Sequence, residues 1–129
     1  MQVSPTPREQ QFVVEPYIQI AEHFSVTRAY LWNCVKRVIK DLTPGSLVIE
    51  VGSGNGKNLR AISERKDIIA IGCDIIPEFT RYTQSPSVDS ILATNLNIPF
   101  RTMCADFVLS IAVVHHFDSE ERRRWALEQ

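Results

Sequence analysis

The stretch Leu-Val-Ile-Glu-Val-Gly-Ser-Gly-Asn-Gly-Lys, at residues 47–57, decides the fold of this 129-residue chain. A mostly apolar run is followed by glycines at alternate positions, namely Gly52, Gly54 and Gly56. This pattern predicts a buried strand that ends in a tight turn, because glycine adopts backbone angles that other residues avoid. A ligand could lie against the bare backbone there, and Gly54 and Gly56 would present amide N–H groups to it where the next helix starts.

The spacing of the glycines distinguishes between two classes of nucleotide ligand. The dinucleotide-binding fingerprint is G-x-G-x-x-G, but here the third glycine comes one residue earlier and is followed by Lys57. The pattern G-x-G-x-G after an acid, Glu50, resembles the first motif of S-adenosylmethionine-dependent methyltransferases. Glu50 would point an acceptor toward the turn, and Ser53 lies within it. A tight turn without any ligand is the alternative.

A second apolar run, residues 68–74, also ends in an acid, Asp74. Asp74 lies 18 positions after Gly56 (74 − 56), close to the offset of about 20 at which a carboxylate binds a ribose. Such a carboxylate can accept hydrogen bonds from both ribose hydroxyls. The alternative is that Asp74 caps the following turn, because Pro77 lies three residues further on.

The composition fits one domain with a substantial core, since 44% of the residues are hydrophobic. The net charge is −1, so no overall basic field would attract nucleic acid and any RNA contact must be local. The only dense basic cluster is Arg122 to Arg124. We favour a solvated helix face for this cluster over an RNA contact.

Cysteine usage and the terminus indicate a reducing, intracellular compartment. Cys34, Cys73 and Cys104 form no C-x-x-C pair, so neither a zinc site nor a disulfide is expected, and the first two fit small buried residues. The polar N-terminus does not resemble a signal peptide, and no run reaches the roughly 20 apolar residues of a membrane span. We expect a soluble protein of the cytoplasm, and also of the nucleus, with no membrane partner.

Hydrophobic periodicity predicts alternating strands and helices after a helical N-terminal region. Residues 1–10 are expected to be a disordered tail, and 11–129 to form the domain. We predict helices at 12–24, 30–41, 57–64, 78–84 and 119–129, strands at 47–51, 68–74, 90–93 and 107–114, and breaks at 25–28 and 85–87. This order implies an α/β fold with a parallel sheet covered on both faces.

Ligands of open parallel sheets bind at the carboxyl ends of the strands, where the distinctive residues of this chain fall. These are Glu50 to Gly56, Asp74, the pair Thr94-Asn95, and Ser110 to His116. The last stretch ends in two adjacent histidines, which contact substrate or serve a structural role. A metal site is not expected, because no third ligand is evident.

Several stretches together resemble the eukaryotic tRNA methyltransferases that methylate the carboxymethyl group of wobble uridine. The resemblance runs from about residue 11 to the end of the chain. The matching stretches are Y-x-x-I-A-x-H-F-S-x-T-R-x-x-x-W at 17–32, V-G-S-G-N-G-K at 51–57, I-G-C-D at 71–74, L-N-I-P-F at 96–100, S-I-A-V-V-H-H-F at 110–117 and E-R-R at 121–123.

The resemblance implies a Rossmann-like class I fold and methyl transfer from S-adenosylmethionine to a uridine carboxylate in tRNA. It also implies a small zinc-containing activator subunit that covers an apolar patch. Arg28 and His115 would lie near the transferred methyl group or the substrate carboxylate; a salt bridge from the N-terminal helices to the sheet is the alternative for Arg28. The residues expected to line the cofactor are Glu50, Gly52, Ser53, Gly54, Gly56, Asp74, Thr94, Asn95 and Ser110.

Two departures from the family pattern stand out. The family has an acid after the third strand that reads the adenine amino group, and this chain has Thr94 there, which accepts a hydrogen bond less strongly. The full fold has about seven strands, whereas this chain is expected to hold about four, as the N-terminal portion of the domain. A non-catalytic methyltransferase-like remnant and a small-molecule methyltransferase are the alternative functions.

Overall fold

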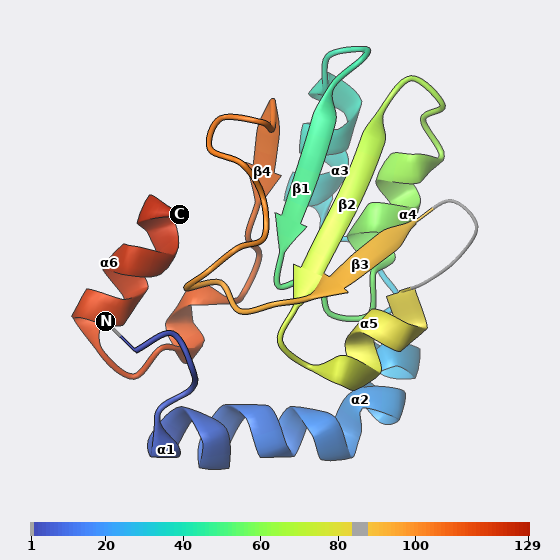
Figure 1. Ribbon diagram of the computed structural model, residues 1–129. Coiled ribbons are helices and arrows are strands. Elements are labelled where there is room, and N and C mark those ends of the chain that lie inside the picture. Colours follow the sequence, from blue (N-terminus) through green and yellow to red (C-terminus); the bar gives the residue numbers. More distant parts are fainter. Residues whose placement is uncertain (1, 84–87) are drawn as a thin grey trace.

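The computed structural model describes residues 2–83 and 88–129. Its elements follow the alternating order that the sequence predicts (Figure 1). They are α1 (Pro7–Glu9), a π-helical turn (Gln10–Val14), α2 (Glu15–Thr27), α3 (Asn33–Asp41), β1 (Leu47–Val51), α4 (Lys57–Ser63), β2 (Ile69–Asp74), α5 (Pro77–Thr83), β3 (Asp89–Leu92), β4 (Phe107–Leu109), a 3-10 turn (Val114–His116) and α6 (Glu120–Glu128).

The four strands form one parallel sheet in the order β3-β2-β1-β4. β1 lies inside the sheet, and its apolar residues Val48 and Ile49 are fully buried because both faces are covered. One face packs against helices, with Val48 beside Ile62 of α4. The other face packs against the segment that joins β3 to β4, where Phe100 contacts the cluster around Ile49.

The long N-terminal helical segment runs across the carboxyl ends of the strands, as Figure 1 shows along the bottom of the view. Its residues Val14 and Ala21 form a buried cluster with Ile76 and Phe79, which follow β2. This packing closes the edge of the sheet at which parallel α/β folds bind their ligands.

Strands and helices agree with the sequence predictions to within a few residues, with two clear differences. β4 ends at Leu109 rather than 114, because the chain turns away and Ala112 takes a left-handed conformation with φ of 57°. α2 continues to Thr27, through most of the break expected at 25–28, and α3 starts at Asn33. The break expected at 85–87 lies outside the described residues.

The prediction of a disordered tail at residues 1–10 is wrong for residues 2–10. The Thr6 side chain caps α1, and the buried carboxylate of Glu9 forms an ion pair of 2.7 Å with Arg122 of α6. The same guanidinium donates to the carbonyl groups of Gln2 and Ser4. The tail is therefore held against α6 by groups that are more than a hundred residues away in sequence.

The same ion pair corrects the interpretation of the arginine cluster. Arg122 is buried, so only part of the cluster forms the solvated face that we favoured, with Arg124 largely exposed. Cys34 is exposed rather than buried, whereas Cys73 is buried as expected. Within residues 2–83 and 88–129, no helix has the length and apolar character to cross a bilayer.

We predict that Arg122→Ala destabilises the chain by about 3–5 kcal/mol, because it leaves the buried Glu9 carboxylate without its cation. Urea denaturation followed by circular dichroism measures the change. The matched control is Arg124→Ala on the same helix, whose exposed pair with Glu120 should contribute less than about 1 kcal/mol. Equal effects of the two substitutions would contradict a dominant role for the buried ion pair.

Candidate cofactor and substrate site

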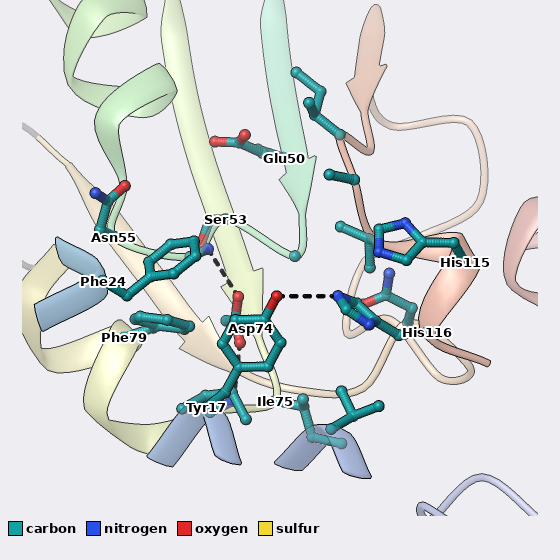
Figure 2. A pocket seen from close by; sticks show the side chains of 18 of the residues that line it. Tyr17, Phe24, Glu50, Ser53, Asn55, Asp74, Ile75, Phe79, His115 and His116 are labelled. Atoms are coloured by element: carbon teal, nitrogen blue, oxygen red, sulfur yellow. Dashed lines mark hydrogen bonds between the residues drawn. The ribbon is translucent and has the colours of Figure 1, made fainter. Parts of the chain in front are cut away.

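A cavity of about 330 Å³ lies at the carboxyl ends of β1 and β2, beneath which α2 passes (Figure 2). This volume is in the range of small-molecule sites. The structure brings nine of the eleven predicted site residues together in its lining: Arg28, Glu50, Gly52, Ser53, Gly54, Asp74, Thr94, Asn95 and His115. The other two, Gly56 and Ser110, do not line it.

Gly56 shapes the turn rather than the cavity surface. It begins α4 with a φ of 74°, and a Cβ atom there would lie 2.6 Å from Cγ2 of Thr83. Gly54 has a φ of 53°, and a Cβ atom there would lie 3.9 Å from Cε1 of the Phe24 ring, an ordinary van der Waals contact. Ser110 is exposed, because β4 ends one residue before it.

The expectation that Gly54 and Gly56 offer free amide N–H groups is wrong. The Gly54 N–H donates to Asp74 Oδ2 over 2.8 Å, and the Gly56 N–H donates to the carbonyl of Ser53 over 3.0 Å. These N–H groups are therefore used to hold the turn, within itself and against Asp74 at the end of β2, and the turn contributes space and shape to the site.

Glu50 is the most unusual group in the cavity, because its buried carboxylate is only half satisfied. Asn58 donates to Oε1 over 2.6 Å, whereas Oε2 has no hydrogen-bond partner among the residues that the structure describes. Burial raises the pKa of the Glu50 carboxyl to about 7, and the Asn58 hydrogen bond opposes this rise. A buried acceptor without a partner is costly, so this oxygen is suited to a ligand that carries a donor.

Asp74 holds the turn between β2 and α5 to the glycine turn. Its Oδ1 accepts from the Ile76 N–H over 2.9 Å, and its Oδ2 accepts from Gly54. Burial raises the pKa of the Asp74 carboxyl, against the lowering effect of these hydrogen bonds. The turn-capping alternative is thus present in the structure. It does not exclude a ribose contact, because each carboxylate oxygen can accept a further hydrogen bond.

The wall opposite the glycine turn is aromatic, and for the segments that carry it the periodicity of the sequence predicted only helices. Tyr17 and Phe24 of α2 and Phe79 of α5 contact one another, with centroid separations of 5.3–5.9 Å. The Tyr17 hydroxyl lies 3.2 Å from Nε2 of His116, and Figure 2 shows this pair at the centre of the cavity. Burial lowers the pKa of the His116 imidazole.

Arg28 and His115 lie at the more open side of the cavity. Both are exposed, and the Arg28 guanidinium sits 5.4 Å from the centre of the Phe24 ring. Among residues 2–83 and 88–129, no carboxylate forms a salt bridge with Arg28, so the salt-bridge alternative is wrong for that part of the chain. Asn55 fixes the backbone beneath Arg28 by donating to the carbonyl groups of Ser25 and Arg28.

Comparison with protein families now identifies the fold. Residues 49–128 match the family described as a methyltransferase domain. The chain belongs to this methyltransferase family.

The methyltransferase domain is similar to curated tRNA methyltransferases. It is 39% identical over 121 residues to the tRNA (carboxymethyluridine(34)-5-O)-methyltransferase alkbh8 of Xenopus tropicalis, covering 94% of this chain and 19% of that protein. It is 40% identical over 118 residues to the tRNA (carboxymethyluridine(34)-5-O)-methyltransferase of Saccharomyces cerevisiae, covering 90% of this chain and 41% of the relative. The chain therefore spans less than half the length of these relatives.

Solved structures confirm the Rossmann-like methyltransferase fold. The methyltransferase in the complex with the Haloferax volcanii Trm112 methyltransferase activator aligns with a TM-score of 0.75 at 20% identity, covering 90% of this chain and 53% of that one. A SAM-dependent methyltransferase from Aquifex aeolicus aligns with a TM-score of 0.68 at 19% identity, covering 86% of this chain and 65% of that one. The [4+2]-cyclase SpnF aligns with a TM-score of 0.75 at 14% identity, covering 98% of this chain and 57% of that one. Because a cyclase shares the fold, the fold alone does not define the reaction.

We predict that the stability of the methyltransferase domain falls as the pH rises through about 7, because folding disfavours the ionised form of Glu50. The contribution of the neutral acid is complete below its ordinary pKa of 4.5 and is lost as the pH passes the raised pKa of about 7. Glu50→Gln should therefore be more stable than the parent at about pH 8 and similar to it at about pH 4.5. Thermal denaturation at both values measures this difference.

Glu64→Gln is the matched control, because Glu64 is an exposed acid just after α4. It should not change the pH dependence of the melting temperature. The same pH dependence in the parent and in Glu50→Gln would show that Glu50 does not titrate in this range.

Proposed function

We propose that this chain binds S-adenosylmethionine in the cavity and transfers its methyl group to the carboxymethyl group of a wobble uridine in tRNA. The Xenopus and yeast relatives are named for this activity, and they match 94% and 90% of the chain. The observation that carries the proposal is the unpartnered Oε2 of Glu50 beside the glycine turn, inside a cavity of suitable volume.

The residues present fit this cofactor. Glu50 Oε2 is a buried acceptor that an ammonium group would satisfy, as the methionine part of the cofactor provides. Asp74 retains acceptor capacity for ribose hydroxyls at the neighbouring strand end. Thr94 and Asn95 line the cavity after β3, where a hydroxyl and an amide would contact the base of the nucleoside.

The proposed reaction makes few chemical demands on the protein. The cofactor, when bound, supplies an activated methyl group, and the substrate carboxylate is already ionised at neutral pH, so no strong general base is needed. The task of the chain is to align the two reactants and to exclude water. The aromatic wall of Tyr17, Phe24 and Phe79 excludes water from one side of the cavity, and the Arg28 guanidinium is available to orient a carboxylate.

A partner on the open edge of the sheet belongs to the same proposal. β3 is an edge strand, and its residues Ile91 and Leu92 are exposed. An unpaired strand edge with apolar side chains fits an added strand from another protein. The structural similarity to a methyltransferase in complex with the Trm112 activator supports a small activator subunit as this partner. The family resemblance of the sequence implies that such a subunit contains zinc.

The decisive experiment mixes the chain, a Trm112-type activator, S-adenosylmethionine and tRNA that carries carboxymethyluridine. Mass spectrometry of the digested nucleosides should show the methyl ester only when both chain and cofactor are present. Cofactor binding without ester would instead support the non-catalytic alternative. Ester formation on small carboxylic acids but not on tRNA would support a small-molecule methyltransferase.

We predict that S-adenosylmethionine binds about tenfold more tightly at pH 7 than at pH 5.5, because Glu50 must ionise to pair with its ammonium group. The ligand ammonium remains protonated over this range, so the change reports on the protein. Isothermal titration calorimetry measures the affinity. Glu50→Gln should bind more weakly and lose the pH dependence, whereas Glu64→Gln should behave like the parent.

A further inference from the structure

Positive charge is segregated in this chain despite its net charge of −1. Residues 23–40 contain four Lys or Arg and no Asp or Glu: Arg28, Lys36, Arg37 and Lys40. All four are exposed, and the last three lie on α3. α4 packs beside α3 behind the sheet in Figure 1 and adds Lys57 at its first turn.

An exposed indole lies where this charge meets the cavity. Trp32 is 52% exposed, precedes α3 and lines the cavity, and Lys57 Nζ lies 5.7 Å from the centre of its ring. Tyr30, two residues earlier, is 88% exposed. Aromatic side chains left in solvent beside cations and at the mouth of a cavity are typical of surfaces that bind nucleobases by stacking.

We propose that the basic face formed by Arg28, Lys36, Arg37, Lys40 and Lys57, together with Trp32, is the RNA-binding surface. This inference rests on the proposed function, which makes a tRNA loop the substrate. Trp32 stacks on a base next to the modified nucleotide at the cavity mouth. The cations of α3 and α4 contact the phosphates of the same strand.

Two observations favour this surface over other locations. Two of the three arginines of α6 are engaged internally, since Arg122 is buried against Glu9 and Arg123 donates to the carbonyl of Phe117. An anionic membrane would also attract the basic face, but Trp32 belongs to a concave wall that a flat bilayer cannot follow. A flexible single strand can enter such a wall, and RNA loops are recognised in this way.

The test measures binding of a fluorescein-labelled RNA hairpin with a carboxymethyluridine in its loop, by fluorescence anisotropy at several salt concentrations. Lys36→Gln with Lys40→Gln should weaken binding about tenfold and make the salt dependence shallower, because each lost phosphate contact lowers the slope by about 1. The control pair, Arg8→Gln with Arg124→Gln, removes the same charge from exposed positions elsewhere and should have little effect.

Trp32→Ala should weaken binding about tenfold without changing the salt slope, because stacking involves no counterion release. Trp32→Phe should restore most of the affinity, and circular dichroism checks that both variants fold. Phe12→Ala is the matched control, since Phe12 is an exposed aromatic residue outside the cavity lining.

The inference would be overturned if the double substitution on α3 and the control double substitution lowered the RNA affinity equally. It would also be overturned if the parent chain bound no RNA. Equally tight binding to phosphatidylserine vesicles with the same dependence on Trp32 would overturn it as well. Calorimetry with S-adenosylmethionine, run on the same samples, tests the proposed function separately. If the basic-face and Trp32 variants keep the RNA affinity of the parent chain, and the parent still binds the cofactor and forms the ester, the proposed function stands and this RNA-binding surface is wrong.

Discussion

The site depends on one carboxylate that joins two strand ends. Asp74 accepts hydrogen bonds from the backbone of Gly54 and of Ile76, so the glycine turn after β1 and the turn after β2 are held in one arrangement. The turn keeps this position because Gly54 and Gly56 adopt positive φ angles that side-chain-bearing residues avoid. Without this link, the two turns that line the cavity would not be held relative to each other, and they could not orient a ligand.

The second acid in the cavity shows what the arrangement is suited to bind. Glu50 and Asp74 are both buried, and the charge of Asp74 adds to the rise in the pKa of Glu50. Burial and the charge of Asp74 disfavour the ionised form of Glu50, and a cationic ligand beside it would stabilise that form. An apolar ligand would make no favourable contact with the Glu50 carboxylate, whereas an ammonium group would donate to its unpartnered oxygen.

Local patterns in the sequence were enough to predict the sheet and one wall of the site. The strand at 47–51, the glycine turn and the two acids follow from hydrophobic runs and from spacing, which act over a few residues. The aromatic wall was missed, because Tyr17 and Phe24 have helical spacing whether they pack in a core or line a cavity. The ion pair of Glu9 and Arg122 was also missed, since residues 113 positions apart leave no local signal.

The site is built from two walls that depend on different parts of the fold. The strand-end wall carries the groups that we propose for cofactor binding, and its geometry is set by the sheet. The aromatic wall comes from Tyr17 and Phe24 of α2 and from Phe79 of α5. The N-terminal helical segment that carries most of it packs through Val14 and Ala21 on residues that follow β2. We therefore expect substitutions in this second wall to affect the acceptor more than they affect the sheet.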